Sequence, residues 1–241
     1  MSNPGSRTAV ILAGGRGTRL RPYTVVLPKP LVPIGEHPIL EVILRQLAKA
    51  GFGEIILAVN HQAEIIQAFF GDGSKWGLKI RYSLESVPLS TMGPLRLITD
   101  LPEDFLIMNG DILSDLDYAA FHDRHVSGGR IFTIAASVRK VPIDYGVLEI
   151  DSAQRLTNYI EKPSLHHHVS MGVYVANRRI LETIPEGRKY GVDELMLDLL
   201  KRHESVTVEP YEGYWLDIGR PDDYAQAIDD FEHQRQRFRF D

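Results

Sequence analysis

The chain has 241 residues, of which 44% are hydrophobic and 24% charged, so it can bury a sizeable core and is not predominantly disordered. Its 32 acidic and 27 basic residues give a net charge of -5, which argues against a nucleic-acid partner held by bulk positive charge. No cysteine is present, which excludes disulfides, thiol nucleophiles and thiolate metal sites and makes the cytoplasm the expected localisation. The first apolar run ends at Gly14, far short of a membrane span, so no membrane partner is expected.

The first half of the chain alternates between predicted strands and helices. Residues 8–13 form a continuous apolar run with β-branched side chains, which is typical of a strand buried on both faces. Residues 38–50 repeat apolar side chains at helical spacing, and Gly51 is positioned to end that helix. The same alternation predicts strands at 54–60, 78–84, 105–108 and 131–138, and helices at 65–70, 95–100 and 118–126.

The second half of the chain mixes hairpin-like and helical patterns. Residues 146–150 and 156–161 predict two paired strands around a polar turn, and residues 169–175 predict a further strand. Helices are predicted at 178–184, 192–203 and 222–235, with short strands at 206–209 and 214–218. Strands that alternate with helices predict an α/β fold, a Rossmann-like three-layer domain with a mixed, mostly parallel central sheet, formed as one domain over residues 1–241. Ligands of such a fold bind at the carboxyl ends of its strands.

A glycine-rich loop follows the first predicted strand. Gly14, Gly15 and Gly17 carry no Cβ, so backbone N–H groups there can approach a phosphate closely. The loop lacks the Gly-Lys-Ser/Thr ending of the P-loop, and Leu20 stands where the dinucleotide motif needs its third glycine. By itself, the loop therefore fits an anion site and an ordinary turn at a strand exit about equally well.

Two cationic side chains come after the loop. Arg19 has a planar fork of donors that suits phosphate oxygens, whereas Lys29 is a mobile point charge. Lys29 lies between Pro28 and Pro30, whose rings leave this segment few backbone conformations. A solvated surface loop would not need that restriction, so we predict that both cations bind the same phosphate group.

With these residues the chain resembles the sugar nucleotidyltransferases, the pyrophosphorylases that join an NTP to a sugar 1-phosphate. The resemblance rests on residues 14–22, GGRGTRLRP, and residues 28–31, PKPL, with order-preserving matches down to Asp217. It implies a nucleotidyltransferase fold related to that of GT-A glycosyltransferases. Residues 1–115 would bind the NTP and residues 116–241 the sugar phosphate. Longer members of the family carry a C-terminal β-helix domain, which is not expected in this chain.

The resemblance also assigns roles to individual residues. Arg19 and Lys29 would hold the triphosphate and, with Asp111 and Asp217, would be the catalytic residues. The residues that it assigns to nucleotide binding are Leu12, Ala13, Gly14, Gly15, Arg16, Gly17, Thr18, Glu85 and Gly93.

Two aspartates each lie at the end of a predicted strand. Asp111 closes the strand at 105–108, and Asp217 ends a short apolar run. Two carboxylates and the oxygens of a phosphate are hard ligands that suit Mg²⁺. Either aspartate alone would also fit a helix cap or a turn. Because the matching aspartates hold the metal in the similar enzymes, Mg²⁺ is the expected cofactor, with Asp111 and Asp217 as its ligands.

The triplet Asp115-Leu116-Asp117 offers an alternative metal site. It resembles the Asp-x-Asp of metal-dependent glycosyltransferases, but short patterns of this kind often arise by chance. Asp117 directly precedes the predicted helix at 118–126 and is well placed as its N-cap. We therefore predict a cap at Asp117 and keep glycosyl transfer as the alternative function.

A pair of residues predicts the sugar side of the site. Glu161 and Lys162 end a predicted strand with an acceptor beside a cation, which suits a sugar phosphate, although a solvated turn is the alternative. In the similar enzymes the matching pair binds the sugar phosphate, and the glycine that matches Gly146 contacts the sugar through its backbone. Ser170 stands where many family members have a sugar-contacting asparagine, and it completes the predicted sugar-phosphate set.

The resemblance leaves the choice of substrates open. Residues 93–95, GPL, look most like mannose 1-phosphate guanylyltransferases, and the short chain also suits heptose 1-phosphate guanylyltransferases, which favours GTP. Uridylyl or thymidylyl transfer to a hexose 1-phosphate, and a non-catalytic NDP-sugar sensor, are the alternatives. A homo-oligomer is compatible with the sequence. The three histidines at 166–168 are expected in a solvated loop rather than at a metal, because consecutive side chains that enter a strand point to opposite faces.

Overall fold

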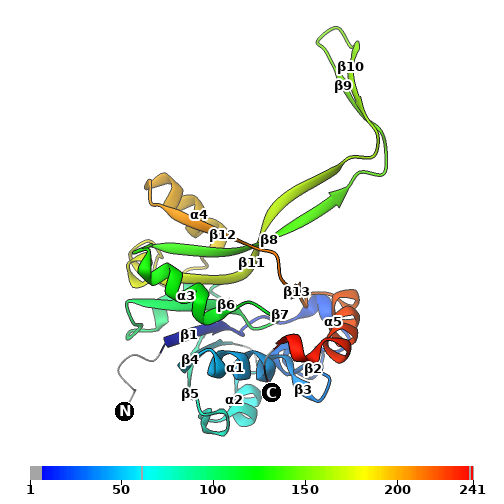
Figure 1. The fold of residues 1–241 in the computed structure, drawn as a ribbon. Coiled ribbons are helices and arrows are strands. Elements are labelled where there is room, and N and C mark those ends of the chain that lie inside the picture. The colour runs from blue at the N-terminus through cyan, green and yellow to red at the C-terminus, as the bar shows by residue number, and fades with distance from the viewer. Residues whose placement is uncertain (1–6, 61, 239, 241) are drawn as a thin grey trace.

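A seven-stranded sheet forms the centre of the structure, a computed structural model that describes residues 7–60, 62–238 and 240. Its strands lie in the order β12-β8-β11-β6-β1-β4-β5 (Figure 1). β11 is antiparallel to both its neighbours, and every other neighbouring pair is parallel, so the predicted mixed, mostly parallel sheet is confirmed. The strands are β1 (Arg7–Leu12), β4 (Phe52–Val59), β5 (Lys79–Leu84), β6 (Asp104–Asn109), β8 (Phe132–Pro142), β11 (Ser164–Asn177) and β12 (Val206–Tyr211).

Helices cover both faces of this sheet. They are α1 (Ile39–Lys49), α2 (Ala63–Phe70), α3 (Tyr118–Ser127), α4 (Val192–Lys201) and α5 (Pro221–His233). In β1, Ala9 and Ile11 point into a buried cluster shared with α1, α2, α3 and α5, whereas Val10 points into a second cluster shared with α4. The predicted three layers are therefore confirmed. Within the described ranges, no helix is both long and apolar enough to cross a membrane.

Two of the predicted helices are short 3₁₀ segments instead. Residues 95–100 were expected to be helical, but the structure has η4 (Gly93–Leu97), and η5 (Arg178–Glu182) replaces the helix at 178–184. Their hydrogen bonds span three residues, as from the Ile98 N–H to the Leu95 carbonyl at 3.2 Å, and such turns rarely extend further. The other 3₁₀ segments are η1 (Thr18–Leu20), η2 (Lys29–Leu31), η3 (Ser74–Trp76) and η6 (Arg235–Phe238).

Three very short strands were not predicted. β2 (Pro33–Ile34) and β3 (His37–Pro38) pair with each other just before α1. β7 (Ile112–Ser114) pairs antiparallel with β13 (Trp215–Asp217), which matches the strand expected at 214–218. Segments of two or three residues are too short to show a strand period in the sequence.

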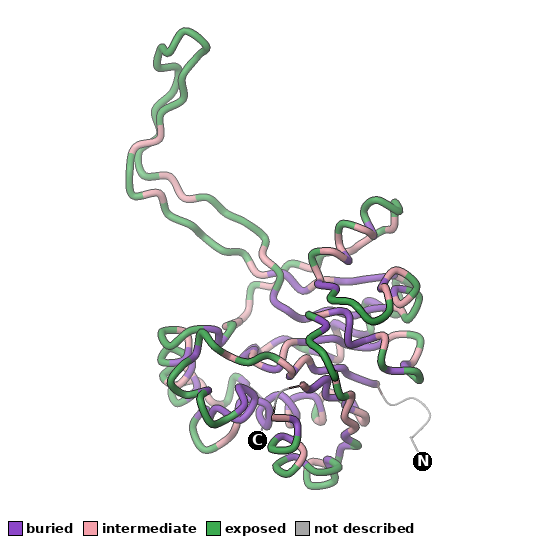
Figure 2. The backbone as a smooth tube through the Cα atoms, turned by 180° about the vertical axis from the view of Figure 1, so that it is seen from behind, coloured by how far each residue is buried: buried purple, intermediate pink, exposed green. Residues whose placement is uncertain are grey.

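A two-stranded arm leaves the body of the molecule. β8 and β11 continue beyond the sheet, and the hairpin of β9 (Val147–Ile150) and β10 (Leu156–Ile160) forms its outer end (Figure 1). We call residues 138–168 the arm; Figure 2 shows that they are largely exposed. The predicted strand pair is confirmed. The expected loop at residues 166–168 is wrong, because these histidines lie in β11, opposite residues 138–140 of β8.

Candidate active site

A cavity of about 440 Å³ lies at the carboxyl ends of four neighbouring parallel strands. Leu12 ends β1 and Asn109 ends β6, whereas Asn60 and Glu85 directly follow β4 and β5. The strand order diverges between β1 and β6, and this is the position where ligands bind in such sheets. The other lining residues are Gly14, Gly15, Arg16, Pro88, Ser90, Thr91, Pro94 and Asp111.

The glycine loop forms one wall of this cavity through close packing. A Cβ at Gly14 would lie 3.0 Å from Glu85 Oε1 and 3.3 Å from Asn60 Cβ, so a side chain there would press on the opposite wall. Gly17 has a φ of 60°, in the left-handed region that favours glycine. Thr24 Oγ1 donates a hydrogen bond to the Gly17 carbonyl at 2.7 Å. The loop is therefore held in one conformation by residues that the sequence motif includes and by Thr24 just beyond it.

Glu85 places a carboxyl group on the wall of the cavity. Its Oε2 accepts a hydrogen bond from the Leu89 N–H at 3.0 Å. Burial raises the pKa of Glu85, although hydrogen bonds from Leu89 and Asn60 oppose the shift. The Oε1 atom, which faces Gly14, can accept a hydrogen bond from an N–H or O–H group of a nucleotide.

Asp111 and Asp217 are brought together by the pairing of β7 with β13. β7 begins one residue after Asp111, and the register places Asp217 opposite Ile112. The Ile218 N–H donates to the Asp111 carbonyl at 3.0 Å, which continues the ladder to the aspartate itself. Two carboxylates that are far apart in the sequence therefore leave neighbouring ends of one small sheet.

Lys29 faces the first of these carboxylates. It opens η2 between Pro28 and Pro30, and its ammonium group pairs with Asp111 Oδ2. Only 11% of the Lys29 side chain and 21% of the Asp111 side chain are exposed. The other oxygen, Asp111 Oδ1, is buried and has no hydrogen-bond partner among the described residues. A buried charged oxygen without a partner is costly, so Oδ1 is suited to a ligand that carries positive charge.

The second carboxylate, Asp217, is exposed on one side and enclosed by protein on the other. Enclosure by the surrounding protein and then the like charge of Asp111 raise the pKa of Asp217, while the charges of Lys29 and Arg19 oppose that shift. A Cβ at Gly219 would lie 3.5 Å from Asp217 Oδ1 and 3.8 Å from Arg19 Nη2, so these two side chains flank the same glycine. The structure thus brings the four predicted catalytic residues into one place.

The two aspartates fit a divalent cation. They repel each other, one of them has a buried unpaired oxygen, and both offer hard oxygen donors. No group of three or more His, Asp or Glu side chains that could hold a metal occurs in the described part of the chain. The protein would therefore provide two ligands and leave the remaining positions to water and phosphate oxygens, which is the usual arrangement for Mg²⁺.

The comparison with known families agrees with this geometry. Residues 8–234 match the family model described as nucleotidyl transferase. The chain belongs to the nucleotidyl transferase family. Mannose-1-phosphate guanyltransferase of Schizosaccharomyces pombe is 36% identical over 228 residues, which cover 90% of this chain and 62% of that protein. Mannose-1-phosphate guanylyltransferase of Mycobacterium tuberculosis is 33% identical over 228 residues, which cover 92% and 64%. The chain thus spans less than two thirds of the length of these curated relatives.

Solved structures resemble this nucleotidyl transferase over nearly its whole length. HddC from Yersinia pseudotuberculosis superposes with a TM-score of 0.73 at 28% identity, covering 93% of this chain and 99% of that chain. HddC complexed with GMP-PN gives a TM-score of 0.70 at 27% identity with the same coverage.

A second cavity of about 520 Å³ adjoins Asp217 on the side of the arm. Cationic side chains outnumber carboxylates in its lining, which suits an anionic ligand. The cations are Arg19, Arg139, Lys140 and Arg220, and the carboxylates are Asp217 and Asp223. Sequence analysis missed Arg139, Lys140 and Arg220. Arg139 and Lys140 directly follow the strand predicted at 131–138, and that position at a strand end could have revealed them.

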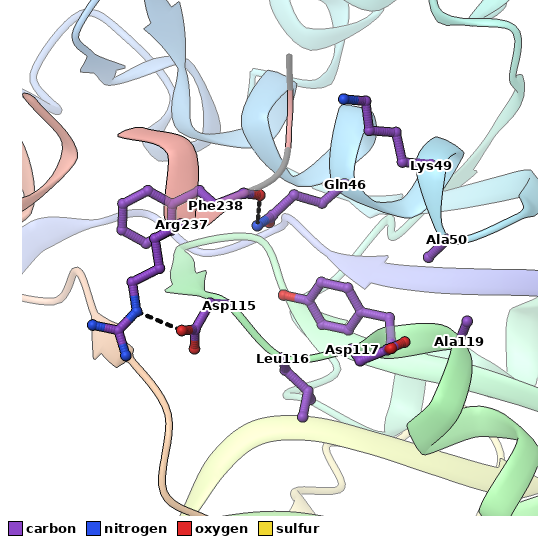
Figure 3. A pocket seen from close by; sticks show the side chains of 10 residues that line it. Gln46, Lys49, Ala50, Asp115, Leu116, Asp117, Ala119, Arg237 and Phe238 are labelled. Atoms are coloured by element: carbon purple, nitrogen blue, oxygen red, sulfur yellow. Dashed lines mark hydrogen bonds and ion pairs between the residues drawn. The ribbon is translucent and has the colours of Figure 1, made fainter. Parts of the chain in front are cut away.

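The alternative Asp-x-Asp site is occupied by contacts within the nucleotidyl transferase itself. Figure 3 shows Asp115 turned toward Arg237 at a separate cavity, and Asp115 also accepts from the Tyr214 N–H at 2.7 Å. Asp117 Oδ1 accepts from the Ala120 N–H at 2.9 Å and caps α3. The predicted cap is confirmed. Both carboxylates are engaged in fold contacts, which disfavours the metal site of a glycosyltransferase.

Ser170 lies near the first cavity. Its Oγ accepts from the Gly172 N–H at 3.2 Å, and Gly172 packs so closely on β6 that a Cβ there would lie 2.6 Å from Asn109 Nδ2. Asn109 also lines the first cavity, so Ser170 is next to the carboxyl end of β6.

The other three predicted sugar-phosphate residues lie on the arm. Gly146 directly precedes β9, and Glu161 and Lys162 directly follow β10. Figure 1 shows this hairpin projecting away from β13 and α5. The chain therefore does not bring Gly146, Glu161 and Lys162 next to Asp111 and Asp217.

The remaining residues predicted for nucleotide binding differ in position. Gly93 is buried, its N–H donates to the Tyr190 carbonyl at 3.0 Å, and a Cβ there would lie 2.9 Å from Leu89 Cβ, so it has a packing role. Ala13 is buried at the exit of β1, whereas Thr18 opens η1 on the surface. Their contacts with a nucleotide stay predictions.

Proposed function

We propose that this chain is a sugar-1-phosphate nucleotidyltransferase. An oxygen of the sugar 1-phosphate attacks the α-phosphorus of an NTP, the bond from that phosphorus to the oxygen bridging to the β-phosphate breaks, and pyrophosphate leaves. The product is an NDP-sugar. The convergence of Lys29, Asp111 and Asp217 beside a cavity walled by the glycine loop carries this proposal. Membership of the nucleotidyl transferase family supports it.

Charge neutralisation is the main task of the site during this reaction. Arg19 and Lys29 would contact the triphosphate, and the lysine would stabilise charge that develops as pyrophosphate departs. Mg²⁺, when bound by Asp111 and Asp217, would supply further positive charge beside the triphosphate. The protein needs no nucleophile of its own, because positioning and electrostatic stabilisation account for most catalysis of phosphoryl transfer.

The two cavities suggest how the substrates would divide. Residues 1–115 would bind the base, ribose and triphosphate, with Glu85 as an acceptor in the first cavity. Residues 116–241 would bind the sugar phosphate, and the cationic lining of the second cavity suits a phosphate group there. Because the reacting oxygen and the α-phosphorus must meet, both substrates would reach Asp111 and Asp217 from opposite sides.

We further propose GTP and mannose 1-phosphate or heptose 1-phosphate as the substrates. Residues 93–95 favour this choice, as do relatives named mannose-1-phosphate guanylyltransferase and the GMP-PN complex of HddC. Uridylyl or thymidylyl transfer to a hexose 1-phosphate is the alternative.

Pyrophosphate release tests the proposal. Each of the four common NTPs would be combined with a panel of hexose and heptose 1-phosphates in the presence of Mg²⁺, with pyrophosphate measured over time. We expect release that depends on both substrates and is fastest with GTP. Release of NDP from an NDP-sugar in the presence of an acceptor, without pyrophosphate, would identify a glycosyltransferase instead. NDP-sugar binding without any turnover would identify a sensor.

A further inference from the structure

The arm carries residues that the family resemblance assigns to the sugar phosphate, but it holds them away from the site of the same chain. Glu161 and Lys162 lie at the foot of the β9–β10 hairpin, and the Tyr159 hydroxyl donates to Glu161 within the arm. Figures 1 and 2, seen from opposite sides, both show the hairpin projecting clear of the body. The sugar-phosphate side of each site is therefore incomplete in one copy of the chain.

Continuous strand pairing fixes the position of that foot. β8 and β11 pair without interruption from Ala136 opposite Ser170 to Pro142 opposite Ser164. The Ile143 N–H then donates to the Pro163 carbonyl at 2.9 Å. Lys162 directly precedes Pro163, so a bend of β9 and β10 beyond this point would move Lys162 far less than it would move the tip of the hairpin. The ladder therefore limits how closely Lys162 can approach Asp217 of its own chain.

The outer hairpin presents an apolar face that nothing in the described chain covers. The register places Leu148 opposite Tyr159 and Ile150 opposite Leu156, so the four side chains share one face. They are 59%, 55%, 62% and 61% exposed in that order. An isolated two-stranded hairpin is marginally stable in water, and an apolar patch of this kind marks a surface that packs against a partner.

A matching apolar surface lies beside the active site. Residues 23–27 connect the Arg19 segment to Lys29, and Tyr23, Val25, Val26 and Leu27 are 49%, 62%, 74% and 42% exposed. We call residues 23–27 the apolar loop. The apolar loop of a second copy could therefore cover the apolar face of the arm. That loop lies next to a site that lacks Glu161 and Lys162.

We propose that two copies of this chain exchange arms. The hairpin of each copy packs on the apolar loop of the other, and Glu161 and Lys162 of each copy complete the sugar-phosphate side of the other copy's site. A two-fold pair satisfies both arms and both sites at once, and exchange of an identical element is a low-cost route to a dimer. This inference rests on the proposed function for the role of the delivered residues, and on the geometry alone for the dimer.

Complementation between two inactive variants tests the exchange. Lys29→Ala removes a residue of the body, and Lys162→Ala removes a residue of the arm. The two chains would be co-expressed with different tags, and the mixed dimer would be purified through both tags in turn. If arms are exchanged, one site of the mixed dimer combines an intact body with an intact arm, so about half of the wild-type rate returns. If each arm serves its own chain, every site carries one lesion and the mixed dimer stays inactive, which would overturn the proposal.

The oligomeric state provides a readout that does not need activity. Sedimentation equilibrium should show a dimer for the wild-type chain and a monomer for a variant with Leu148→Ser, Ile150→Ser and Leu156→Ser. Leu200→Ser is the matched control, since Leu200 is also 61% exposed but lies on α4, and it should stay dimeric. A monomeric wild-type chain, or a dimer that survives the triple substitution, would refute arm exchange. Absence of pyrophosphate release with every substrate pair would instead refute the proposed function and leave the sedimentation result to decide on the dimer.

Discussion

Replacement of Lys29 by alanine should lower the rate of the reaction while the chain still folds. The Lys29 side chain is 11% exposed, so water cannot readily take its place, and the removed ammonium group leaves Asp111 as its unpaired partner. Loss of one preorganised charge contact to a transition state costs about 100- to 1000-fold in kcat. We therefore expect Lys29→Ala to lower kcat by at least about a hundredfold. The loss of stability should stay below the ~3–5 kcal/mol of a broken fully buried ion pair, because 21% of the Asp111 side chain reaches solvent.

The assay for this prediction is pyrophosphate release at saturating substrates, together with the circular dichroism spectrum and a urea titration of the same samples. Lys201→Ala is the control, because the Lys201 side chain is 74% exposed at the end of α4 and pairs only with Asp198 among the described residues. The control should keep both wild-type turnover and wild-type stability. Unchanged turnover in Lys29→Ala would refute the assignment of Lys29 to the reacting phosphates, and an unfolded variant would show that the ion pair with Asp111 is mainly structural.

Three further predictions follow from the electrostatics and capping of the fold. Mg²⁺ at 100 times its Kd should stabilise the wild-type chain by about 2.7 kcal/mol in a thermal melt, and should not stabilise Asp217→Asn; an equal shift in both would exclude Asp217 as a ligand. Asp117→Ala should cost about 1 kcal/mol in a urea titration through the lost cap of α3, with its dependence on Mg²⁺ unchanged. Burial lowers the pKa of His125 below its ordinary value of 6.5, although Asp104 opposes the shift, so the unfolded chain binds its proton more tightly. The free energy of unfolding should therefore fall as the pH drops below 6.5, and His125→Gln should flatten that fall.

The glycine loop and its cations could be predicted because their chemistry is local in the sequence. Gly14, Gly17 and Lys29 lie within a short stretch whose residue types restrict the backbone directly, through absent Cβ atoms and proline rings. The proximity of Asp111 and Asp217 had a different basis. It depends on pairing between β7 and β13, which no local pattern shows, and only the family resemblance indicated it.

The arm shows where sequence reasoning reached its limit. Two of its strands could be predicted, because residues 146–150 and 156–161 have strand patterns. The position of these strands relative to Asp217 could not be predicted. The segment at 166–168 lies outside the core and has polar side chains on both faces of its strand, so its histidines looked like a loop. Which copy of the chain receives Glu161 and Lys162 is a question of tertiary and quaternary geometry, and residue types alone do not answer it.

One reversed strand accounts for both the site and the arm. Neighbouring parallel strands need a crossover segment, so a bare ribbon can extend only from an antiparallel pair. β11 is the strand of the main sheet that runs against its neighbours, and its pairing with β8 continues outward as the arm. On its other side β11 pairs with β6, whose carboxyl end leads to Asn109 and Asp111. The strand that pairs with β6 beside Asp111 is thus the same strand that continues outward into the arm, so substitutions that disturb β11 should affect both the proposed arm exchange and the rate.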